Sequence, residues 1–450
     1  MIQKIGIVPG DPTAPVFHRF RSESAEHLLI VPFSRVFDLS SELARGFDAG
    51  DPSVLALAHA LAAPTRDEVP LEDVVVPSPQ SISLNVSVAC NLACSYCYAS
   101  GGAFNGAQPS AMSWSTAQRA IDQLLSGADH ARPVTIAFMG GEPFVNRSLI
   151  HRAVAYADAA AKSREIDVRF SDTTNGTLLG PDDIALLRAH RFAVTVSVDG
   201  GATLHDAQRP LHGRAAGGSF AALRRAFEPL LRDPGLAQIV ARATVTRRDL
   251  NVASRVAAIL KIGFQEVGVS PLRVDPRGGQ ALVGADWGRY LDALKAAARV
   301  ELTYAERHHR LRLTNLAVAL RQIHRGASAP YPCGAGGGYF SVASDGRWFA
   351  CHRAIGSADF DLGDGEGLDA EKRRRFLKSR HVHAQSACRR CWARYLCSGA
   401  CHQEASARSD SGCGFIRGWL EFCLATYCDV LNGCPELLHA VPDADEGAVR

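Results

Sequence analysis

The sequence predicts an α/β protein made of a partial (β/α)6 barrel, a small N-terminal α+β unit and a C-terminal cysteine-rich domain stapled by metal. Between residues 81 and 310, short apolar segments of strand length alternate with longer segments of helical periodicity. Ten of the thirteen cysteines lie between Cys333 and Cys434, where this alternation stops and short, glycine-rich segments begin. With 450 residues, the chain has room for two or three such domains.

The N-terminal unit is expected over residues 1–80, and a proline-rich connection over residues 70–79 marks its end. Its short apolar segments fit a strand pair around Pro32 that is followed by helices. The expected strands cover residues 27–31 and 35–37, and the expected helices include Leu43 and residues 55–61.

Six strand-helix units in a row are expected in the barrel, over residues 81–310. Such a series favours parallel strands covered by helices, and six units would form an open version of the eight-fold barrel. A doubly wound sheet has the same periodicity and is the alternative. The expected strands cover residues 82–88, 134–139, 167–170, 193–198, 238–245 and 266–269, and the helices cover 116–125, 149–161, 182–190, 220–231, 252–260 and 290–300. The C-terminal domain is expected over residues 311–450, with a helix over 415–431 and a polar tail.

Composition and charge narrow the class of protein. The chain is 47% hydrophobic and 21% charged, which is typical of soluble globular proteins. We expect no membrane or nucleic-acid partner, because no apolar run approaches the ~20 residues that span a bilayer and the net charge is only +3. The N-terminus shows no signal-peptide pattern, so a cytoplasmic location is expected. Thirteen cysteines in that compartment favour metal binding over disulfides.

The first cysteine group follows the first strand of the expected barrel. Cys90, Cys94 and Cys97 have the spacing Cys-x3-Cys-x2-Cys. Three thiolates on one loop can hold three irons of a 4Fe–4S cluster and leave the fourth iron without a protein ligand. An open coordination position is typical of a reactive metal centre. A structural zinc site would need a fourth ligand, and the histidines considered, His130 and His151, are distant in sequence.

This loop, with Asn91-Leu92 and Tyr96 inside it, resembles the signature of radical S-adenosylmethionine (SAM) enzymes. The resemblance implies that SAM chelates the open iron, and that one electron cleaves SAM to a 5′-deoxyadenosyl radical that abstracts a hydrogen atom. It also implies a reducing partner such as flavodoxin or ferredoxin. The cofactor carries the chemistry, and the protein orients and shields it.

The other motifs of this resemblance follow successive strands, where ligands gather in a β/α barrel. The Gly-Gly-Glu-Pro segment would meet the SAM ammonium through its backbone, the Asn-Gly turn would form a pocket wall, and a Ser and an Asp would meet the ribose. An arginine would pair with the SAM carboxylate; the alternative is a charge at the barrel rim. Such turns also occur in unrelated proteins. The implied residues are Gly140, Gly141, Glu142, Pro143, Asn175, Ser197, Asp199 and Arg242.

The C-terminal cysteines resemble the SPASM domain, an extension of radical SAM enzymes that carries auxiliary 4Fe–4S clusters. Seven cysteines occur in the expected order, with Asp345-Gly346 in the expected turn. The resemblance implies one cluster on Cys388, Cys391, Cys397 and Cys413, and another on Cys333, Cys351 and Cys401. With the SAM-binding cluster, this makes three 4Fe–4S clusters. A zinc ribbon is the alternative for Cys388 to Cys401.

The second auxiliary set has only three cysteines. An open iron, a non-cysteine ligand or Cys434 would complete it. Cys423 and Cys428 have helical spacing among apolar residues and are expected in the core.

The resemblance implies a function in maturation of a ribosomally made peptide or protein. SPASM enzymes form C–S or C–C cross-links, formylglycine and related oxidised products on such substrates, and a cross-link is expected here. Residues 397–405 and 413–421 are similar to the maturation enzyme of quinohemoprotein amine dehydrogenase. The N-terminal unit is expected to recognise the peptide, which could add to a sheet edge; a cap that only packs on the barrel is the alternative.

The sequence offers three candidates for the acid–base residue. Sulfatase maturases place an Asp after the cysteine that matches Cys351, whereas this chain has His352. This disfavours sulfatase-maturase-type oxidation, which remains an alternative together with a small-molecule radical SAM dehydrogenase. His352 can accept a proton near neutral pH, and Glu404 and Asp345 are the other candidates.

Overall fold

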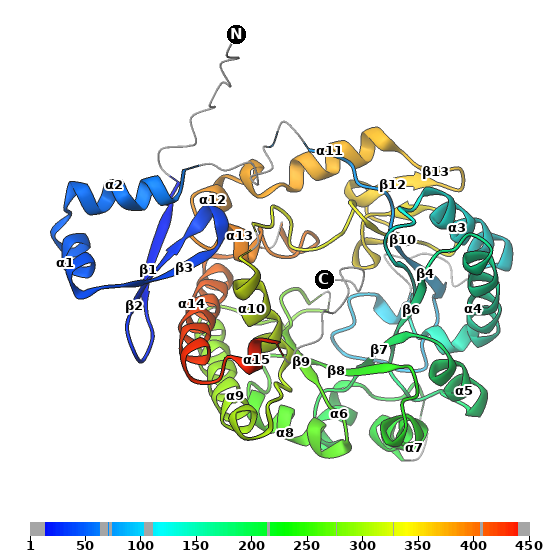
Figure 1. Ribbon diagram of the computed structural model, residues 1–450. Coiled ribbons are helices and arrows are strands. Elements are labelled where there is room, and N and C mark those ends of the chain that lie inside the picture. Colours follow the sequence, from blue (N-terminus) through cyan, green and yellow to red (C-terminus); the bar gives the residue numbers. More distant parts are fainter. Residues whose placement is uncertain are drawn as a thin grey trace, which may run out of the picture.

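The computed structural model describes residues 14–63, 71, 74–102, 111–213, 217–275, 277–326, 328–405 and 408–439 (Figure 1). The expected connection over residues 70–79 falls partly outside these residues, and so does the expected polar tail, of which residues 440–450 lie outside them.

Six parallel strands form one side of a ten-stranded sheet and follow one another in chain order, with the last of them at the sheet edge. A doubly wound sheet would reverse its strand order at the middle, so that alternative is wrong and the partial (β/α)6 barrel is confirmed. These strands are β4 (Ser81–Ser87), β5 (Val134–Gly140), β6 (Val168–Thr174), β7 (Phe192–Ser197), β8 (Gln238–Val245) and β9 (Val267–Pro271).

Helices cover the outside of this curved sheet, and the strands enclose the centre of the molecule (Figure 1). The helices that connect the strands are α3 (Trp114–Gly127), α4 (Arg147–Lys162), α5 (Pro181–Ala189), α6 (Ala202–Gln208), α7 (Gly218–Arg232) and α8 (Val252–Ile262), and α9 (Asp286–His308) follows β9. Capping residues start several of them: Ser113 accepts a hydrogen bond from Thr116 N, and Asn251 accepts one from Ser254 N. The short helix α6 was not expected from the sequence.

The C-terminal domain continues the barrel sheet. Strand β10 (Tyr339–Val342) pairs in parallel with β4, so that Tyr339 lies opposite Ser81. Three short antiparallel strands extend the sheet further: β11 (Trp348–Phe349), β12 (Asp361–Asp364) and β13 (Gly367–Leu368). The helices of this part are α10 (Thr314–Arg325), α11 (Ala370–Arg380), α12 (Ser386–Arg389), α13 (Arg394–Cys397), α14 (Asp410–Gly433) and α15 (Glu436–His439).

The N-terminal unit is a three-stranded antiparallel sheet with two helices. It contains β1 (Phe17–Arg21), β2 (Glu26–Ile30), β3 (Arg35–Leu39), α1 (Ser41–Ala49) and α2 (Pro52–Leu61). The expected strand pair and helices are present, and β1 was not expected. The unit docks on the C-terminal domain: the His18 ring stacks on Trp392 with centroids 3.9 Å apart, and Arg394 Nη1 donates to Pro15 O at 2.7 Å.

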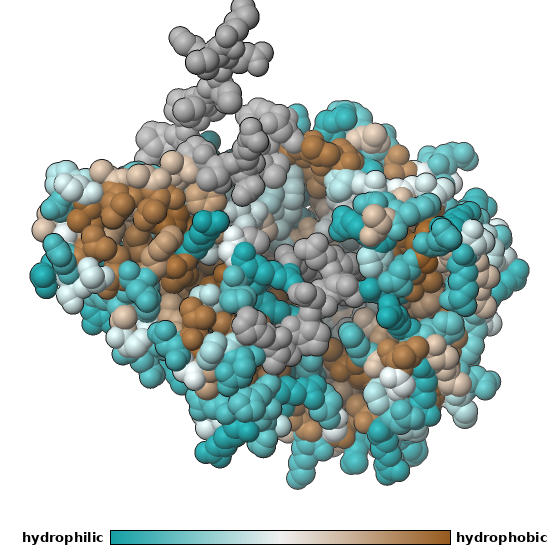
Figure 2. All heavy atoms as spheres, in the orientation of Figure 1, coloured by the Kyte–Doolittle hydropathy of each residue, from teal (hydrophilic) through white to brown (hydrophobic). Residues whose placement is uncertain are grey.

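Apolar side chains gather on the surface of the N-terminal unit (Figure 2). Among them, Phe37 on β3 is 39% exposed and Leu57 on α2 is 48% exposed. Within the described residues, no helix is long and apolar enough to cross a bilayer.

Candidate active site

The three cysteines of the first group lie on a loop after β4 and face a cavity of about 500 Å³. The cavity opens at the C-terminal ends of the barrel strands, where Thr173, Ser197 and Thr244 line it. The predicted residues Gly140, Gly141 and Asn175 also line it. The structure therefore brings the three thiols together with part of the predicted SAM pocket.

Each of these thiols accepts a hydrogen bond, as sulfur ligands of iron–sulfur clusters do. Cys90 Sγ accepts from Leu92 N at 3.4 Å and from Asn175 Nδ2 at 3.8 Å. Cys97 Sγ accepts from Gly101 N at 3.3 Å. Cys94 Sγ accepts from Arg209 Nη1 at 3.9 Å.

The donor set fits a cluster with one open iron. Burial raises the pKa of Cys90 to about 12, so the metal-free thiol is protonated, and iron must displace its proton on binding. Burial also raises the pKa of Cys94, while the nearby Arg209 guanidinium acts in the opposite direction. Thiols of this kind become ligands when a metal stabilises the thiolate.

The glycine pair after β5 is required by close contact with the cysteine loop. A Cβ atom on Gly140 would lie 2.2 Å from Ser87 O, and one on Gly141 would lie 2.4 Å from Ala89 O. Gly141 N donates to Ser87 O at 2.8 Å, so the two segments are bonded through their backbones. The absence of side chains on these glycines thus allows their backbone to pack closely against the backbone of the cysteine loop.

Glu142 is a buried carboxylate that joins the ends of β5 and β6. It accepts hydrogen bonds from Thr174 Oγ1 and Asn175 N, both at 2.7 Å, and from Phe144 N at 3.2 Å. Burial raises the pKa of Glu142 to about 7, although these hydrogen bonds oppose the shift. Pro143 follows it as the first residue of a short 3-10 helix, Pro143–Asn146.

Asp199 is fully buried after β7, and its carboxylate is bonded within the protein. Arg209 Nε donates to it at 3.1 Å and Thr244 N at 2.9 Å, and the Tyr96 hydroxyl donates as well. Ser197, two residues earlier, lines the cavity. A ribose contact of Asp199 therefore stays a prediction, whereas its structural role is visible.

Arg242 lies on β8 opposite Ser197 in the strand register. Its guanidinium lies against β9, where a Cβ atom on Gly268 would be 2.6 Å from Arg242 Nη1. It is outside the set of residues that line the cavity. Pairing with a SAM carboxylate stays a prediction for this residue.

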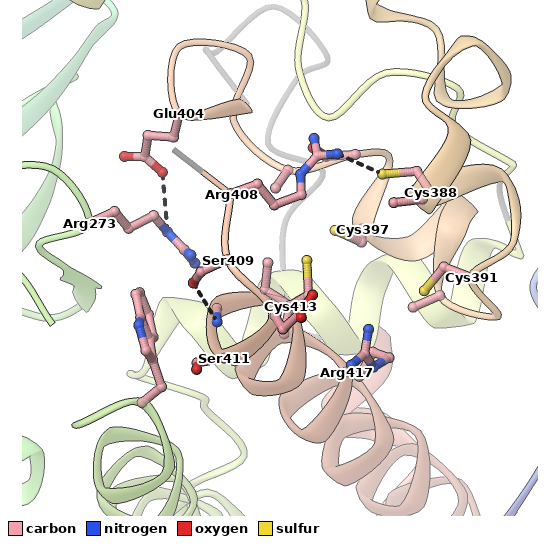
Figure 3. A pocket seen from close by; sticks show the side chains of 18 of the residues that line it. Arg273, Cys388, Cys391, Cys397, Glu404, Arg408, Ser409, Ser411, Cys413 and Arg417 are labelled. Atoms are coloured by element: carbon pink, nitrogen blue, oxygen red, sulfur yellow. Dashed lines mark hydrogen bonds and ion pairs between the residues drawn. The ribbon is translucent and has the colours of Figure 1, made fainter. Parts of the chain in front are cut away.

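Four C-terminal thiols surround a second cavity of about 340 Å³. Figure 3 shows the sulfur atoms of Cys388, Cys391, Cys397 and Cys413 around one space. Cys413 lies in the first turn of α14, where the helix dipole favours negative charge. Arg408 Nη1 donates to Cys388 Sγ at 3.1 Å. These are the four cysteines for which the resemblance to the SPASM domain implies one auxiliary cluster.

Cys333, Cys351 and Cys401 form the other set. Burial raises the pKa of Cys351 to about 12, and the nearby charges of Cys401 and Cys333 add to the shift. Three consecutive residues between Cys397 and Cys401 have left-handed backbone, with φ of 52°, 84° and 60°. Two of them are not glycine, and such conformations cost about 1–3 kcal/mol each. This turn separates Cys401 from the cavity that Cys397 lines.

Cys434 follows the last residue of α14, whereas Cys413 lies in its first turn. At 1.5 Å per residue, about 30 Å of helix separates them. That distance separates Cys434 from the four-cysteine set, and a contribution of Cys434 to the three-cysteine set stays a prediction. Cys423 and Cys428 are buried within the same helix, as expected. In the part of the chain that the structure describes, no three His, Cys, Asp or Glu side chains form a single-ion site.

Glu404 lies in the wall between the two cavities and lines both of them. Arg273 Nε lies 3.1 Å from one carboxylate oxygen and Arg353 Nη2 lies 2.9 Å from the other. Figure 3 shows the Arg273–Glu404 pair at the edge of the four-thiol space. Arg353 also donates to Cys401 Sγ at 3.7 Å. This bridge connects the barrel with both cysteine sets of the C-terminal domain.

The other two acid–base candidates lie away from the cavities. His352 Nδ1 is 2.8 Å from the Tyr339 hydroxyl, which also bonds Ser83 Oγ at 2.8 Å. Burial lowers the pKa of His352 to about 3, and the Arg353 charge adds to this effect, so the ring is neutral. Asp345 lies in the exposed turn between β10 and β11 and accepts a hydrogen bond from Arg347 N at 3.0 Å.

A family comparison agrees with this geometry. Residues 84–232 match the family model of the Radical SAM superfamily. These residues are a radical SAM domain. The first cysteine group and the predicted SAM residues from Gly140 to Asp199 all lie within it.

The chain is 23% identical over 368 residues to the serine-type anaerobic sulfatase-maturating enzyme of Klebsiella aerogenes, across 78% of the chain and 84% of that enzyme. It is 31% identical over 203 residues to the mycofactocin maturase MftC of Mycobacterium ulcerans, across 45% of the chain and 49% of MftC. An uncharacterized protein of Methanocaldococcus jannaschii is 31% identical over 136 residues, 30% of the chain. The match spans only 44% of that protein's length.

Solved structures show the same fold. The structure of native anSMEcpe with bound AdoMet has a TM-score of 0.67 at 19% identity and covers 79% of the chain and 100% of that structure. Streptococcus suis SuiB bound to precursor peptide SuiA has a TM-score of 0.51 at 12% identity, across 88% of the chain and 96% of SuiB. Both structures therefore share the fold of this chain.

Sequence analysis missed several charged residues of this site. Arg209, Arg273 and Arg353 line the larger cavity. Only Arg353 carried a local signal, since it follows the predicted ligand Cys351 by two positions. Arginines on loops have no periodicity, so only the folded structure places the other two.

We predict that Glu142→Gln changes how stability depends on pH. The pKa of Glu142 is raised on folding, so its protonation favours the folded state, and that contribution is lost as the pH rises toward 7. Between pH 5.5 and 8, wild type should lose about 2 kcal/mol of unfolding free energy relative to the variant. Urea unfolding across this range measures the difference. Glu306→Gln, on an exposed position of α9, is the matched control, and parallel curves for wild type and Glu142→Gln would refute the prediction.

Proposed function

We propose that this chain is a radical SAM maturase that oxidatively modifies side chains of a ribosomally made peptide or protein, by C–S or C–C cross-linking. The observation that carries the proposal is a single cavity lined by both domains. The barrel contributes the thiols of Cys90, Cys94 and Cys97, and the cysteine-rich domain contributes Glu404. The names of two relatives, both maturases, support the same class of reaction.

The chain's own residues would bind and shield the reactants. When bound, SAM and the clusters supply a hydrogen-abstracting radical and electron transfer. Asn175 and Ser197 line the cavity beside the cysteine loop, so we assign the SAM side of the cavity to them. Tyr290, Phe415 and Trp419 also line the cavity and would exclude water from the reacting atoms. A volume of about 500 Å³ lies within the range of ligand pockets.

We propose Glu404 as the acid–base residue. A C–S cross-link removes a hydrogen atom from carbon, a proton from the thiol and one electron, so the thiol proton needs an acceptor near the reacting atoms. The Glu404 carboxylate lines the cavity, whereas His352 and Asp345 do not. Arg273 and Arg353 hold its two oxygens from both sides and fix its position.

The N-terminal unit is proposed to recognise the peptide. Strand β3 is an edge strand that pairs only with β2 among the described strands, and most of its residues are partly or fully exposed. An extended peptide can add to such an edge through backbone hydrogen bonds. Because the unit docks on Trp392, next to Cys391, a peptide held there would lie beside the auxiliary-cluster domain.

A second candidate is sulfatase-maturase-type oxidation of a single side chain. The alignment with the Klebsiella enzyme favours it, since it spans 78% of the chain. Against it, His352 stands where those enzymes have an Asp, and it is bonded to Tyr339 outside the cavity. The two candidates differ in product: an aldehyde on one residue or a bond between two.

We predict that a short peptide encoded beside this gene loses two hydrogen atoms per modified site when it is co-expressed with the enzyme under anaerobic conditions. Mass spectrometry measures the change, and tandem fragmentation locates the linked residues. Cys94→Ala should abolish the product, because it removes one of three iron ligands. Cys423→Ala, in the core of α14, should retain it.

The chemistry of the product separates the candidates. A cross-linked peptide lacks fragments between the linked residues and does not react with a hydrazide probe. A product that reacts with hydrazide and fragments normally would contradict cross-linking and favour the sulfatase-maturase type. An unchanged peptide mass would contradict both for this peptide.

We further propose three 4Fe–4S clusters, of which two are auxiliary. Cys397→Ala removes a ligand of the four-thiol set, so the anaerobically reconstituted variant should hold about four fewer iron atoms per chain. Iron and sulfide analysis measures this loss. Cys428→Ala is the matched control, because Cys428 is buried in α14 away from both sets, and equal iron in both variants would refute the assignment.

A further inference from the structure

The cysteine loop is held by a segment of the chain that no motif marks. Residues Gln208–His212 run antiparallel to the loop, with Leu211 bridged to Leu92. Ala93 N donates to Pro210 O at 2.8 Å, Ser95 N donates to Gln208 O at 3.2 Å and His212 N donates to Asn91 O at 2.9 Å. We call Gln208–His212 the loop strap. Its backbone contacts fix the course of the loop on both sides of Cys94.

Arg209 of the loop strap places a positive charge beside Cys94. Its side chain is buried and lies between two groups: Nη1 is 3.9 Å from Cys94 Sγ, and Nε is 3.1 Å from a carboxylate oxygen of Asp199. The guanidinium also lies 5.3 Å from the centre of the Tyr96 ring. Three contacts therefore orient the planar guanidinium, and one of its N–H groups points to sulfur.

The three thiols differ in the charge of the groups that donate hydrogen bonds to them. Cys90 and Cys97 accept hydrogen bonds from neutral donors, the backbone N–H groups of Leu92 and Gly101 and the Asn175 amide. Cys94 accepts from a cation. Asp199 lies behind Arg209, so the guanidinium is the charge in direct contact with the thiol.

We propose that Arg209 is a positioning residue for the SAM-binding cluster, and that it raises the reduction potential of that cluster through its charge and its hydrogen bond to Cys94. The inference rests on the proposed function in one respect, that the first cysteine loop holds a 4Fe–4S cluster. Reduction adds a negative charge to the cluster, and a buried cation near a sulfur ligand stabilises the reduced state. Asp199 offsets part of this effect and keeps Arg209 in place.

The test compares Arg209→Gln, Arg209→Lys and a matched control, Arg164→Gln, at an exposed position just after α4. Each full-length variant is reconstituted with iron and sulfide, and its iron content is measured. An EPR-monitored redox titration then gives the potential of the SAM-binding cluster, which is identified as the signal that changes when SAM is added. The measurement of the potential needs no peptide, so its result is independent of whether the enzyme modifies a peptide.

Arg209→Gln should lower the ratio of reduced to oxidised cluster roughly tenfold at a fixed potential, which corresponds to about 59 mV for a one-electron couple. Arg209→Lys should show a smaller shift, because it keeps the charge but loses the geometry of the guanidinium. The control should match wild type. An unchanged potential in Arg209→Gln at normal iron content would overturn the proposal. Loss of the SAM-responsive cluster from Arg209→Lys would also overturn it, because the loop strap would then act only on assembly.

Discussion

A single buried carboxylate, that of Asp199, holds the catalytic end of the barrel together. It accepts hydrogen bonds from Tyr96 in the cysteine loop, from Arg209 in the loop strap and from Thr244 N on β8. Its backbone carbonyl accepts from Arg255 Nη1 at 2.8 Å. Removing one partner of a buried ion pair typically costs about 3–5 kcal/mol, because the other charge is left unpaired. The position of the three thiols therefore depends on this ion pair as much as on the loop's own sequence.

The ion pairs of Glu404 hold the two domains together, as the contacts of Asp199 hold the barrel end together. Arg273 belongs to the segment after β9, and Arg353 and Glu404 belong to the cysteine-rich domain. Arg273 also lies 4.8 Å from the centre of the Trp287 ring on α9, which packs against α14. The carboxylate thus ties the wall of the larger cavity to both C-terminal cysteine sets.

The barrel could be predicted from sequence because buried parallel strands and amphipathic helices leave local periodic signals. All six predicted strands and their helices are present, and only the strand order, a property of the folded chain, separated the barrel from a doubly wound sheet. The pairing of β10 with β4 left no such signal, since Ser83 and Tyr339 are 256 residues apart. Within the site, spacing was sufficient to find the thiols. It did not reveal that Glu142 and Asp199 accept hydrogen bonds from the protein itself, or that Arg209 donates to Cys94, because these contacts join residues that are far apart in the sequence.

The proposed function requires that a hydrogen atom would move from a peptide side chain to a radical that SAM would supply in this cavity. The most direct measurement uses the peptide encoded beside the gene, made with deuterated side chains and incubated anaerobically with the enzyme, SAM and a reductant. Mass spectrometry of the 5′-deoxyadenosine released then reports the transfer. We predict deuterium in that product with wild type, and no 5′-deoxyadenosine with Cys94→Ala. Release of unlabelled 5′-deoxyadenosine together with a modified peptide would contradict the account.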